Sequence, residues 1–349
     1  MPETYRLLGG PGSPYSMKLR AILRYRRLPH VWLVPNGYLS SGGELRDAGK
    51  SMIPVLQYPD GSYWADSTPL AYALEARHPA QRSIIPPDSG QAFISHLIED
   101  FADELLVAAM FDLRWGSGLD QRFCAVRQLS GWMSPVANDL LEKRVAQFTE
   151  RQSTQQAKLA QGDNHSILIG LYRQVLVLIE GMLEQTAFLF GGRPSLGDFG
   201  LYGQLVQCAT DPSASAIMRQ DAIRTFQWTQ LLDDASGIEG EWLAPEDNNQ
   251  VVEGLLKLIG RVYLPFLLGH ARGVVESSDT FTVQIGDLIW KGYPKPYRLN
   301  CLIWLRRELA DMPVSARERI RALLERHDCW DALQPDALNE ADVPAMLPV

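Results

Sequence analysis

The order of strand and helix patterns in the first 80 residues constrains the fold of this chain more than any other feature. An alternating run at 5–8 ends in the turn Gly9-Gly10-Pro11-Gly12, and apolar residues then recur at helical spacing from Tyr15 to Leu23. Residues 31–34 are again apolar, which favours a second strand. The pattern therefore predicts a strand, a helix and a strand in succession.

A β-hairpin and a helix are predicted to follow. The runs at 54–58 and 62–65 flank Pro59-Asp60-Gly61, which is typical of a hairpin turn. We expect a helix to begin at Ser67 as its N-cap and to end at His78-Pro79. The combined order, β-α-β followed by β-β-α, predicts a thioredoxin-like α/β domain.

The remainder of the chain carries helical patterns, at 94–108, 168–190, 199–208, 251–268 and 299–309. In Ser195-Leu196-Gly197-Asp198 the serine oxygen is expected to accept an amide, and the aspartate to reach back to the serine amide. We therefore expect two domains, at 1–80 and 90–349, the second all-helical and extended from about residue 240. The sequence leaves open whether this extension is a lid, part of a dimer interface or a layer behind the helices.

Composition and charge exclude several classes of protein. With 349 residues, 46% hydrophobic and 21% charged, the chain is expected to be globular. Charged residues interrupt its long apolar stretches and no secretory signal is visible, so we expect no membrane contact and a cytoplasmic location. The net charge of −8 argues against a nucleic-acid partner. Residues 1–80 hold nine Lys and Arg against six Asp and Glu, which favours a small anion there.

No metal is expected. The four cysteines are widely spaced and never form C-x-x-C, so they predict buried free thiols: Cys124, Cys208, Cys301 and Cys329. His96, Asp100, Asp103 and Glu104 lie on successive turns of the helix predicted at 94–108. Such a charged helix face is usually solvated, so we interpret it as surface.

Four motifs resemble those of serine-type cytosolic glutathione transferases. Residues 13–20, Ser-Pro-Tyr-Ser-Met-Lys-Leu-Arg, are similar to the S-P-[FY]-x-x-[KR]-[VL]-R motif of the first helix in that family. Residues 53–56 resemble its V-P-x-L motif with a cis proline, and residues 66–67 its acidic-serine pair. Residues 192–202 resemble the capping segment of its helical domain. The resemblance covers roughly residues 1–235 and implies the glutathione transferase architecture.

The resemblance implies that the Ser13 hydroxyl activates the glutathione thiol. A thiol with a pKa near 8.5 must drop by about two units, or roughly 2.7 kcal/mol, to ionise at neutral pH. A hydroxyl that donates to the thiolate contributes about 1.5–3 kcal/mol and a helix N-terminus about 0.3–1 kcal/mol, which together suffice. Ser13 precedes Pro14, so it is also expected to cap the helix. Tyr15 and Ser16 are the fallback donors, and Tyr15 is also consistent with a core aromatic.

Glutathione-binding residues follow from the same resemblance. Ser67 and Asp66 are expected to hold the carboxylate and the ammonium of the γ-glutamyl unit. The Ile53 backbone would pair with the cysteinyl unit beside a cis Pro54. Lys50 would meet the glycyl carboxylate, although the sequence around it lacks the N-P-x-G-[KQ] run of the family, and a solvated loop lysine is the alternative.

The function implied is a glutathione transferase that attacks a small hydrophobic electrophile, with glutathione as cosubstrate and a homodimer as the assembly. One alternative is a non-catalytic protein of the same fold that binds ligands or partners. Another is a glutathione-dependent disulfide reductase or lyase, although the first 123 residues contain no cysteine. Arg114-Trp115 could border the pocket of the second substrate or anchor a tryptophan between domains.

Overall fold

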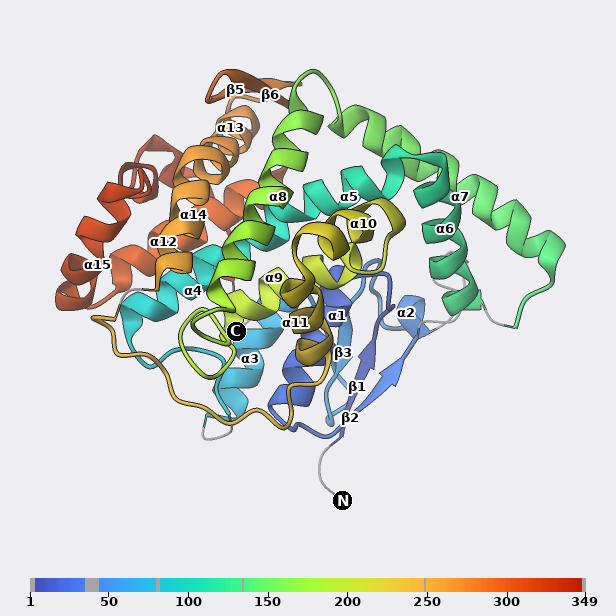
Figure 1. Cartoon of the computed structure of the whole chain (residues 1–349), viewed down its shortest axis with the longest axis horizontal. Coiled ribbons are helices and arrows are strands. Elements are labelled where there is room, and N and C mark those ends of the chain that lie inside the picture. The colour runs from blue at the N-terminus through green and yellow to red at the C-terminus, as the bar shows by residue number, and fades with distance from the viewer. Residues whose placement is uncertain (1–3, 35–43, 80–81, 134, 248, 347–349) are drawn as a thin grey trace. The chain divides into compact units, whose positions relative to one another are not determined.

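A computed structural model describes residues 4–34, 44–79, 82–133, 135–247 and 249–346 (Figure 1). The chain forms two compact units that interleave along the sequence. The first unit comprises Met1–Ile84, Met110–Ala157 and Phe199–Ile238, and the second comprises Ile85–Ala109, Lys158–Asp198 and Glu239–Val349. The predicted domain bounds of 1–80 and 90–349 stay a prediction, and residues 80 and 347–349 lie outside the described residues.

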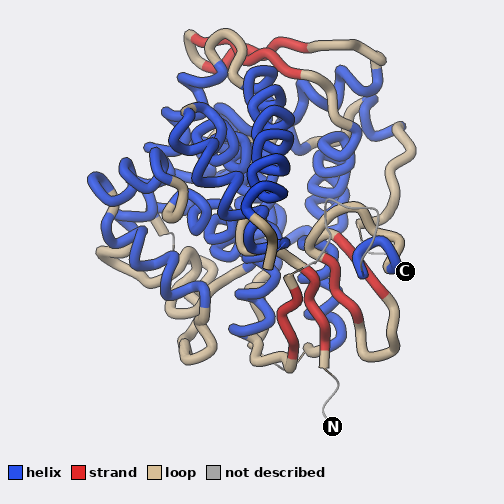
Figure 2. Tube along the Cα trace, turned by 90° about the vertical axis from the view of Figure 1, so that its right-hand side faces the viewer, coloured by secondary structure: helices blue, strands red, loops and turns tan. Residues whose placement is uncertain are grey.

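The first unit contains a four-stranded sheet in the order β2-β1-β3-β4 (Figure 2). Strand β1 is parallel to β2 and antiparallel to β3, which is antiparallel to β4. The strands are β1 (Tyr5–Leu8), β2 (His30–Leu33), β3 (Val55–Gln57) and β4 (Tyr63–Ala65), and the helices α1 (Pro14–Tyr25), α2 (Glu44–Asp47) and α3 (Ser67–Arg77). Leu19 and Leu23 of α1 and Leu70 and Leu74 of α3 form a buried core with Leu7 and Leu56 of the sheet. The thioredoxin-like order is confirmed, and the short helix α2 is added to it.

Further helices complete the first unit: the end of α5 (Val107–Gly116), α6 (Gly118–Met133), most of α7 (Asn138–Leu159) and of α9 (Leu196–Cys208), α10 (Pro212–Asp221) and α11 (Ile223–Asp233). Aromatic rings join α5, α6 and α7. Trp115 lies edge-on to Phe148 with ring centroids 5.6 Å apart, and Trp132 approaches the same ring at 6.1 Å. Trp115 is therefore a buried core residue of this unit.

The second unit is mostly helical. It contains α4 (Ser89–Phe101), α8 (Asn164–Met182), α12 (Gln250–Leu258), α13 (Leu264–Val275), α14 (Pro296–Asp311) and α15 (Val314–Arg326). Each of the two helices predicted at 94–108 and 251–268 is interrupted by a π-helical segment. It lies at Ala102–Leu106 in the first and at Ile259–Tyr263 in the second. Within the described ranges, no helix is long and apolar enough to span a membrane.

A β-hairpin adds to the expected all-helical region, while the fold class as a whole is confirmed. Strands β5 (Phe281–Ile285) and β6 (Leu288–Gly292) pair antiparallel through a turn at Gly286, whose φ is +59°. Residues in this left-handed region are usually glycine because a Cβ atom is disfavoured there. The C-terminal region is therefore mostly helical rather than all-helical.

The helix face at His96, Asp100 and Asp103 is buried and Glu104 is largely enclosed, so the interpretation of this face as a solvated surface is wrong. The extension after residue 240 supplies its partners. The Tyr263 hydroxyl donates to Asp100 at 2.5 Å, Arg298 donates to Glu104 at 3.1 Å, and Glu308 pairs with His96. Within the second unit, the extension thus packs on α4 and replaces water as the partner of its charged groups.

This buried cluster predicts that stability falls as pH rises from about 4, where the carboxyl groups of the unfolded chain ionise, to about 9. Burial raises the pKa of Glu104 to about 8 and that of Asp100 to about 6. Burial alone would lower the pKa of His96, but Glu308 and the neighbouring carboxylates raise it to about 9. All three pKa values lie above those of the unfolded chain, so the folded state binds more protons and loses this stabilisation as pH rises through them.

Thermal unfolding at several pH values tests this prediction. The melting temperature should fall across the range, and Glu104→Gln, which cannot titrate, should flatten the fall below about pH 8. Glu318→Gln on the exposed surface of α15 is the matched control and should leave the profile unchanged. A melting temperature that rises over the same range would contradict the prediction.

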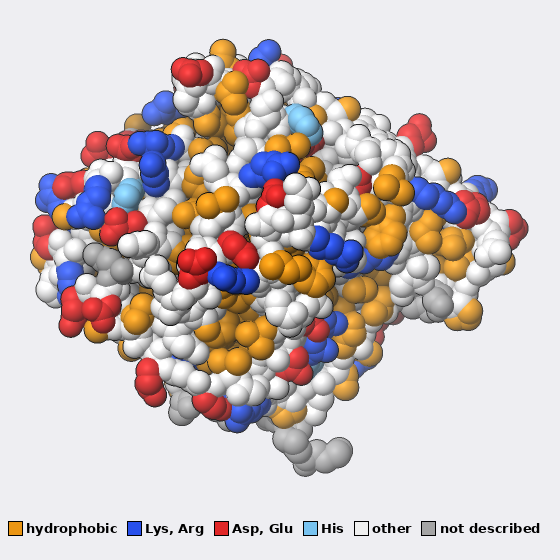
Figure 3. Space-filling view, viewed as in Figure 1, with side chains coloured by type: hydrophobic (Ala, Val, Ile, Leu, Met, Phe, Trp, Pro, Cys, Tyr) orange, Lys and Arg blue, Asp and Glu red, His pale blue; other side chains and the backbone are white. Residues whose placement is uncertain are grey.

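Charged side chains of both signs are interspersed on the face drawn in Figure 3. On that face, the described lysines and arginines do not merge into one broad patch. All four cysteines are free and buried, as expected.

Candidate functional site

Strand register brings the predicted site residues to one edge of the first unit's sheet. Leu8 of β1 pairs with Val55 of β3, and Val55 pairs with Ala65 of β4. Because β3 runs antiparallel to both neighbours, the chain after Leu8 and Ala65 meets the chain before Val55 at this edge. The segments that meet there are loop 9–13, residues 53–54 and residues 66–67.

Ser13 is the N-cap of α1, as predicted. Its Oγ accepts a hydrogen bond from the Ser16 amide at 3.3 Å, which leaves the hydroxyl hydrogen available to donate elsewhere. Ser13 and Tyr15 are half-buried, whereas Ser16 is fully enclosed and its Oγ has no hydrogen-bond partner among the described residues. Ser13 therefore combines partial exposure with a place at the helix N-terminus.

The cis Ile53–Pro54 peptide bond is present, as the resemblance implies. Ile53 is half-buried and packs against the cluster that contains Trp132. Lys50 lies half-buried in the segment between α2 and β3, where its amide donates to the Leu45 carbonyl at 3.1 Å. The roles of Ile53, Pro54 and Lys50 in binding stay predictions.

Asp66, and not Ser67, occupies the N-cap of α3, so the predicted cap position is shifted by one residue. Ser67 is the first helical residue because Asp66 has φ +82° and ψ 120°, outside the helical region. A non-glycine residue in such a conformation costs about 1–3 kcal/mol and often marks a functional site. The Ser67 amide is thereby one of the N–H groups at the helix start that have no acceptor within the helix.

Lys18 is a residue of this site to which the sequence analysis gave no role. Its side chain is 0% exposed, and its ammonium donates to Ser67 Oγ at 3.4 Å and to Thr68 Oγ1 at 3.1 Å. An ammonium can only donate, so the Ser67 oxygen accepts this bond and its own hydrogen is available to donate. The start of α3 therefore combines a buried positive charge with a hydroxyl donor, which suits a carboxylate.

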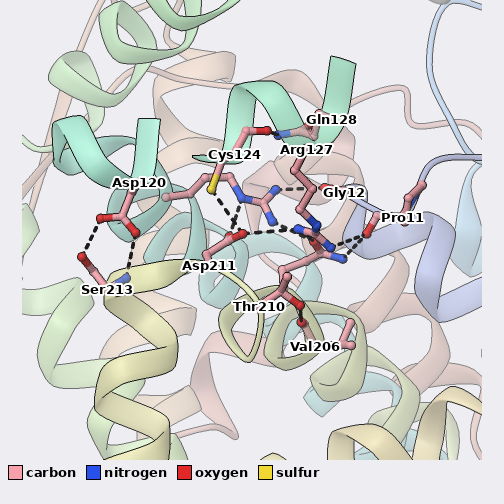
Figure 4. A network of polar contacts seen from close by, with 12 residues as sticks. Pro11, Gly12, Asp120, Cys124, Arg127, Gln128, Val206, Thr210, Asp211 and Ser213 are labelled. Carbon is pink, nitrogen blue, oxygen red and sulfur yellow. Dashed lines mark hydrogen bonds and ion pairs between the residues drawn. The ribbon is translucent and has the colours of Figure 1, made fainter. Parts of the chain in front are cut away.

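A buried polar network under loop 9–13 is a second feature that sequence reasoning missed (Figure 4). Arg114 donates to the Gly12 carbonyl at 2.9 Å, and Arg127 donates to the Pro11 carbonyl at 3.0 Å. Both guanidinium groups pair with Asp211, Arg114 at 2.6 Å and Arg127 at 3.3 Å. Two charged side chains thus bind the backbone of the loop that leads into Ser13.

Helix α6 packs directly on the same loop. A Cβ atom at Gly10 would lie 2.4 Å from the indole nitrogen of Trp132, and one at Gly12 would lie 2.4 Å from Gln128 Cγ. The loop therefore needs glycine at these two positions, since any larger residue would displace side chains of α6. This requirement explains the run of glycines that the sequence shows before Ser13.

Comparison with known proteins identifies the N-terminal part of the chain. Residues 12–77 match the family described as glutathione S-transferase, N-terminal domain. No curated protein matches the chain. The matched segment runs from the last residue before Ser13 to the end of α3, so it contains every predicted site residue.

Solved structures with a similar fold include a glutathione S-transferase from Methylobacterium radiotolerans in complex with glutathione sulfonate. It is 18% identical, with 70% of this chain and 98% of that chain covered and a TM-score of 0.42. The beta-etherase LigF from Sphingobium sp. strain SYK-6 is 15% identical over 67% of this chain and 95% of its own, with a TM-score of 0.48. Rice GST1 in complex with glutathione is 15% identical, with 66% of this chain and 86% of that chain covered and a TM-score of 0.43.

Proposed function

We propose that the chain is a glutathione transferase whose Ser13 hydroxyl stabilises the glutathione thiolate. The match of residues 12–77 to the glutathione S-transferase N-terminal domain supports this proposal. The cosubstrate is a small hydrophobic electrophile. The assembly is a homodimer in the cytoplasm, and the reaction needs no metal.

The observation that carries this proposal is the meeting of loop 9–13, residues 53–54 and residues 66–67 at one sheet edge. An edge of this kind offers a hydroxyl at a helix N-terminus for the thiol and a second helix N-terminus for a carboxylate. Lys18 adds a buried positive charge under the second helix. Glutathione carries a thiol, which the Ser13 hydroxyl would bind, and a γ-glutamyl carboxylate, which the start of α3 would bind.

The chemistry follows from the position of Ser13. The glutathione thiol loses its proton to solvent, and the Ser13 hydroxyl donates a hydrogen bond to the sulfur anion that remains. A sulfur lone pair then forms a bond to an electrophilic carbon, and either a halide leaves or the neighbouring carbon of an alkene takes a proton from solvent. Ser13 forms no covalent bond in this scheme and lowers the energy of the nucleophile.

The class of electrophile follows from the apolar residues near the loop. Trp132 approaches Gly10, and Ile53 packs on the cluster of Trp132, Leu129 and Phe148. Apolar and aromatic side chains favour the burial of apolar ligand surface. We therefore propose a hydrophobic electrophile that lies beside α6.

Calorimetric titration of reduced glutathione into the dialysed protein tests the proposed function. Saturable binding is expected for the wild type. The absence of heat at millimolar glutathione would contradict the proposal and favour a non-catalytic binding protein on the same fold.

The variant Lys18→Met is predicted to bind glutathione at least about tenfold more weakly. Methionine keeps most of the length of the buried side chain but removes the charge that faces Ser67 and Thr68. Hydrogen bonds to charged groups contribute about 1.5–3 kcal/mol. Lys143→Met, on the exposed surface of α7, is the matched control. Equal affinity in wild type and Lys18→Met, with unchanged circular dichroism, would remove Lys18 from the binding site.

A further inference from the structure

The carbonyl groups before Ser13 are fixed by cations from helices far along the chain. Pro11 and Gly12 are the last two residues before Ser13, and both carbonyl oxygens accept from guanidinium groups. A third donor, the Gln207 amide, reaches the Pro11 carbonyl at 3.0 Å. A carbonyl oxygen carries partial negative charge, so each of these two carbonyl groups is attracted to the guanidinium group that donates to it.

The network carries more positive than negative charge. Two guanidinium groups share one carboxylate, Asp211, whose side chain is 1% exposed. Cys124 donates to the same carboxylate at 3.3 Å and stays a neutral thiol, because burial raises its pKa. The remaining partner, Gln207, is uncharged. Within the network itself, one positive charge therefore has no carboxylate of its own.

Two other buried carboxylates lie on the same helices and accept hydrogen bonds from neutral groups outside this network. Asp112 of α5 accepts from Gln156 at 2.8 Å. Asp120 of α6 accepts from the Ser213 amide at 2.8 Å, on the side of the network away from Pro11 (Figure 4). Burial and the proximity of Arg114 lower the pKa of Arg127, as expected for a cation that a shared carboxylate compensates only in part. An arginine nevertheless stays charged at neutral pH.

We propose that Arg127 and Arg114 are positioning residues of the reaction: they fix the loop before Ser13 and supply the positive potential that stabilises a thiolate held at Ser13. This inference rests on the proposed function. The two residues act through the loop and the field rather than by contact with the sulfur. The two groups then add to the stabilisation that Ser13 and the helix N-terminus give to the thiolate.

Arg127→Met is the variant that tests this inference most cleanly. It leaves Arg114 and Asp211 as a neutral pair, so no uncompensated charge is created, and the side chain of Arg127 is only partly buried. The thiol pKa of bound glutathione, read from the ultraviolet absorbance of the thiolate against pH, is expected to rise by about one unit. Below that pKa, kcat/KM should fall about tenfold, while the affinity for glutathione stays near that of the wild type.

Two further variants separate charge from structure. Arg127→Lys keeps the charge and is expected to restore most of the thiolate signal. Asp211→Asn removes the negative charge and is expected to move the thiol pKa in the opposite direction, downward. This variant also keeps the inference testable should Arg127→Met fail to fold. Arg122→Met, on the exposed surface of α6, is the matched control and should change nothing.

The inference is overturned if Arg127→Met and Asp211→Asn bind glutathione with an unchanged thiol pKa. It is also overturned if both variants shift the thiol pKa in the same direction. One variant removes a positive charge and the other a negative charge, so an effect of charge must shift the pKa in opposite directions. Absence of glutathione binding in the wild type would instead contradict the proposed function itself. The two failures are therefore distinguishable in one set of titrations.

Discussion

Replacement of Asp198 by alanine is expected to lower the free energy of unfolding by about 4 kcal/mol. Asp198 is 0% exposed and accepts three hydrogen bonds, from the Ser195 amide at 2.8 Å, the Ser195 hydroxyl at 2.6 Å and the Leu189 amide at 3.0 Å. Alanine would leave these donors buried without an acceptor, and each such donor costs about 1–3 kcal/mol. The helix would also lose part of its capping box, which contributes about 0.5–2 kcal/mol.

Urea unfolding followed by circular dichroism measures this loss. Ser195→Ala is the graded companion. It removes the hydroxyl bond to Asp198 and the long bond that the hydroxyl accepts from the Asp198 amide, but it leaves both amide bonds to the carboxylate in place. We expect it to cost about 1 kcal/mol, well below the loss in Asp198→Ala. If Asp198→Ala lowers the free energy of unfolding no more than Ser195→Ala does, the bonds to the Asp198 carboxylate do not contribute the stability assigned to them.

Replacement of Gly260 by alanine is expected to destabilise the second unit by about 3 kcal/mol or more. A Cβ atom at Gly260 would lie 1.8 Å from the carbonyl oxygen of His327 and 3.0 Å from its carbonyl carbon. These are backbone atoms, so no side-chain rotation relieves the overlap, and the π-helical segment or the chain after α15 must move.

Gly170→Ala is the matched control for this prediction. Gly170 also lies in a helix, α8, but a Cβ atom there would meet nothing within 4 Å. Alanine should therefore stabilise that helix by about 0.5–1 kcal/mol, the opposite sign to Gly260→Ala. Thermal unfolding of the two variants side by side gives the comparison. Equal effects would show that the close approach at Gly260 is relieved at little cost.

Local patterns in the sequence predicted the elements of the first unit well. Alternation, the Pro59-Asp60-Gly61 turn and the apolar stripes of α1 and α3 are short-range signals, and the observed strands begin and end within a residue or two of the expected bounds. The capping box of Ser195 and Asp198 is likewise confirmed, because its three-residue spacing fixes its hydrogen bonds locally.

Features that depend on partners distant in sequence were not predictable. The charged face of α4 looks like any solvated face until Tyr263, Arg298 and Glu308 are packed against it. The hairpin β5–β6 did carry a signal, because Gly286 and Asp287 separate two apolar alternating runs. The expectation of an all-helical extension therefore missed a local signal that the sequence contains.

The candidate site divides in the same way. Ser13, Pro54, Asp66 and Ser67 are marked by short motifs, and the register of the sheet brings their segments together. Lys18 stands in the motif at 13–20, but its bond to α3 spans 49 positions, so the motif alone gave it no role. The other partners come from elsewhere in the chain, and Arg114 and Asp211 are 97 positions apart. No local pattern distinguishes such arginines from those on the surface.

The thiolate absorbance of glutathione bound to the wild type and to Ser13→Ala tests the central claim most directly. The account predicts that the wild type lowers the thiol pKa by about two units, and that Ser13→Ala raises it again by about one to two units without loss of binding. Tyr15→Phe and Ser16→Ala, the fallback donors, should behave as the wild type. An unchanged thiolate signal in Ser13→Ala would contradict activation by this serine.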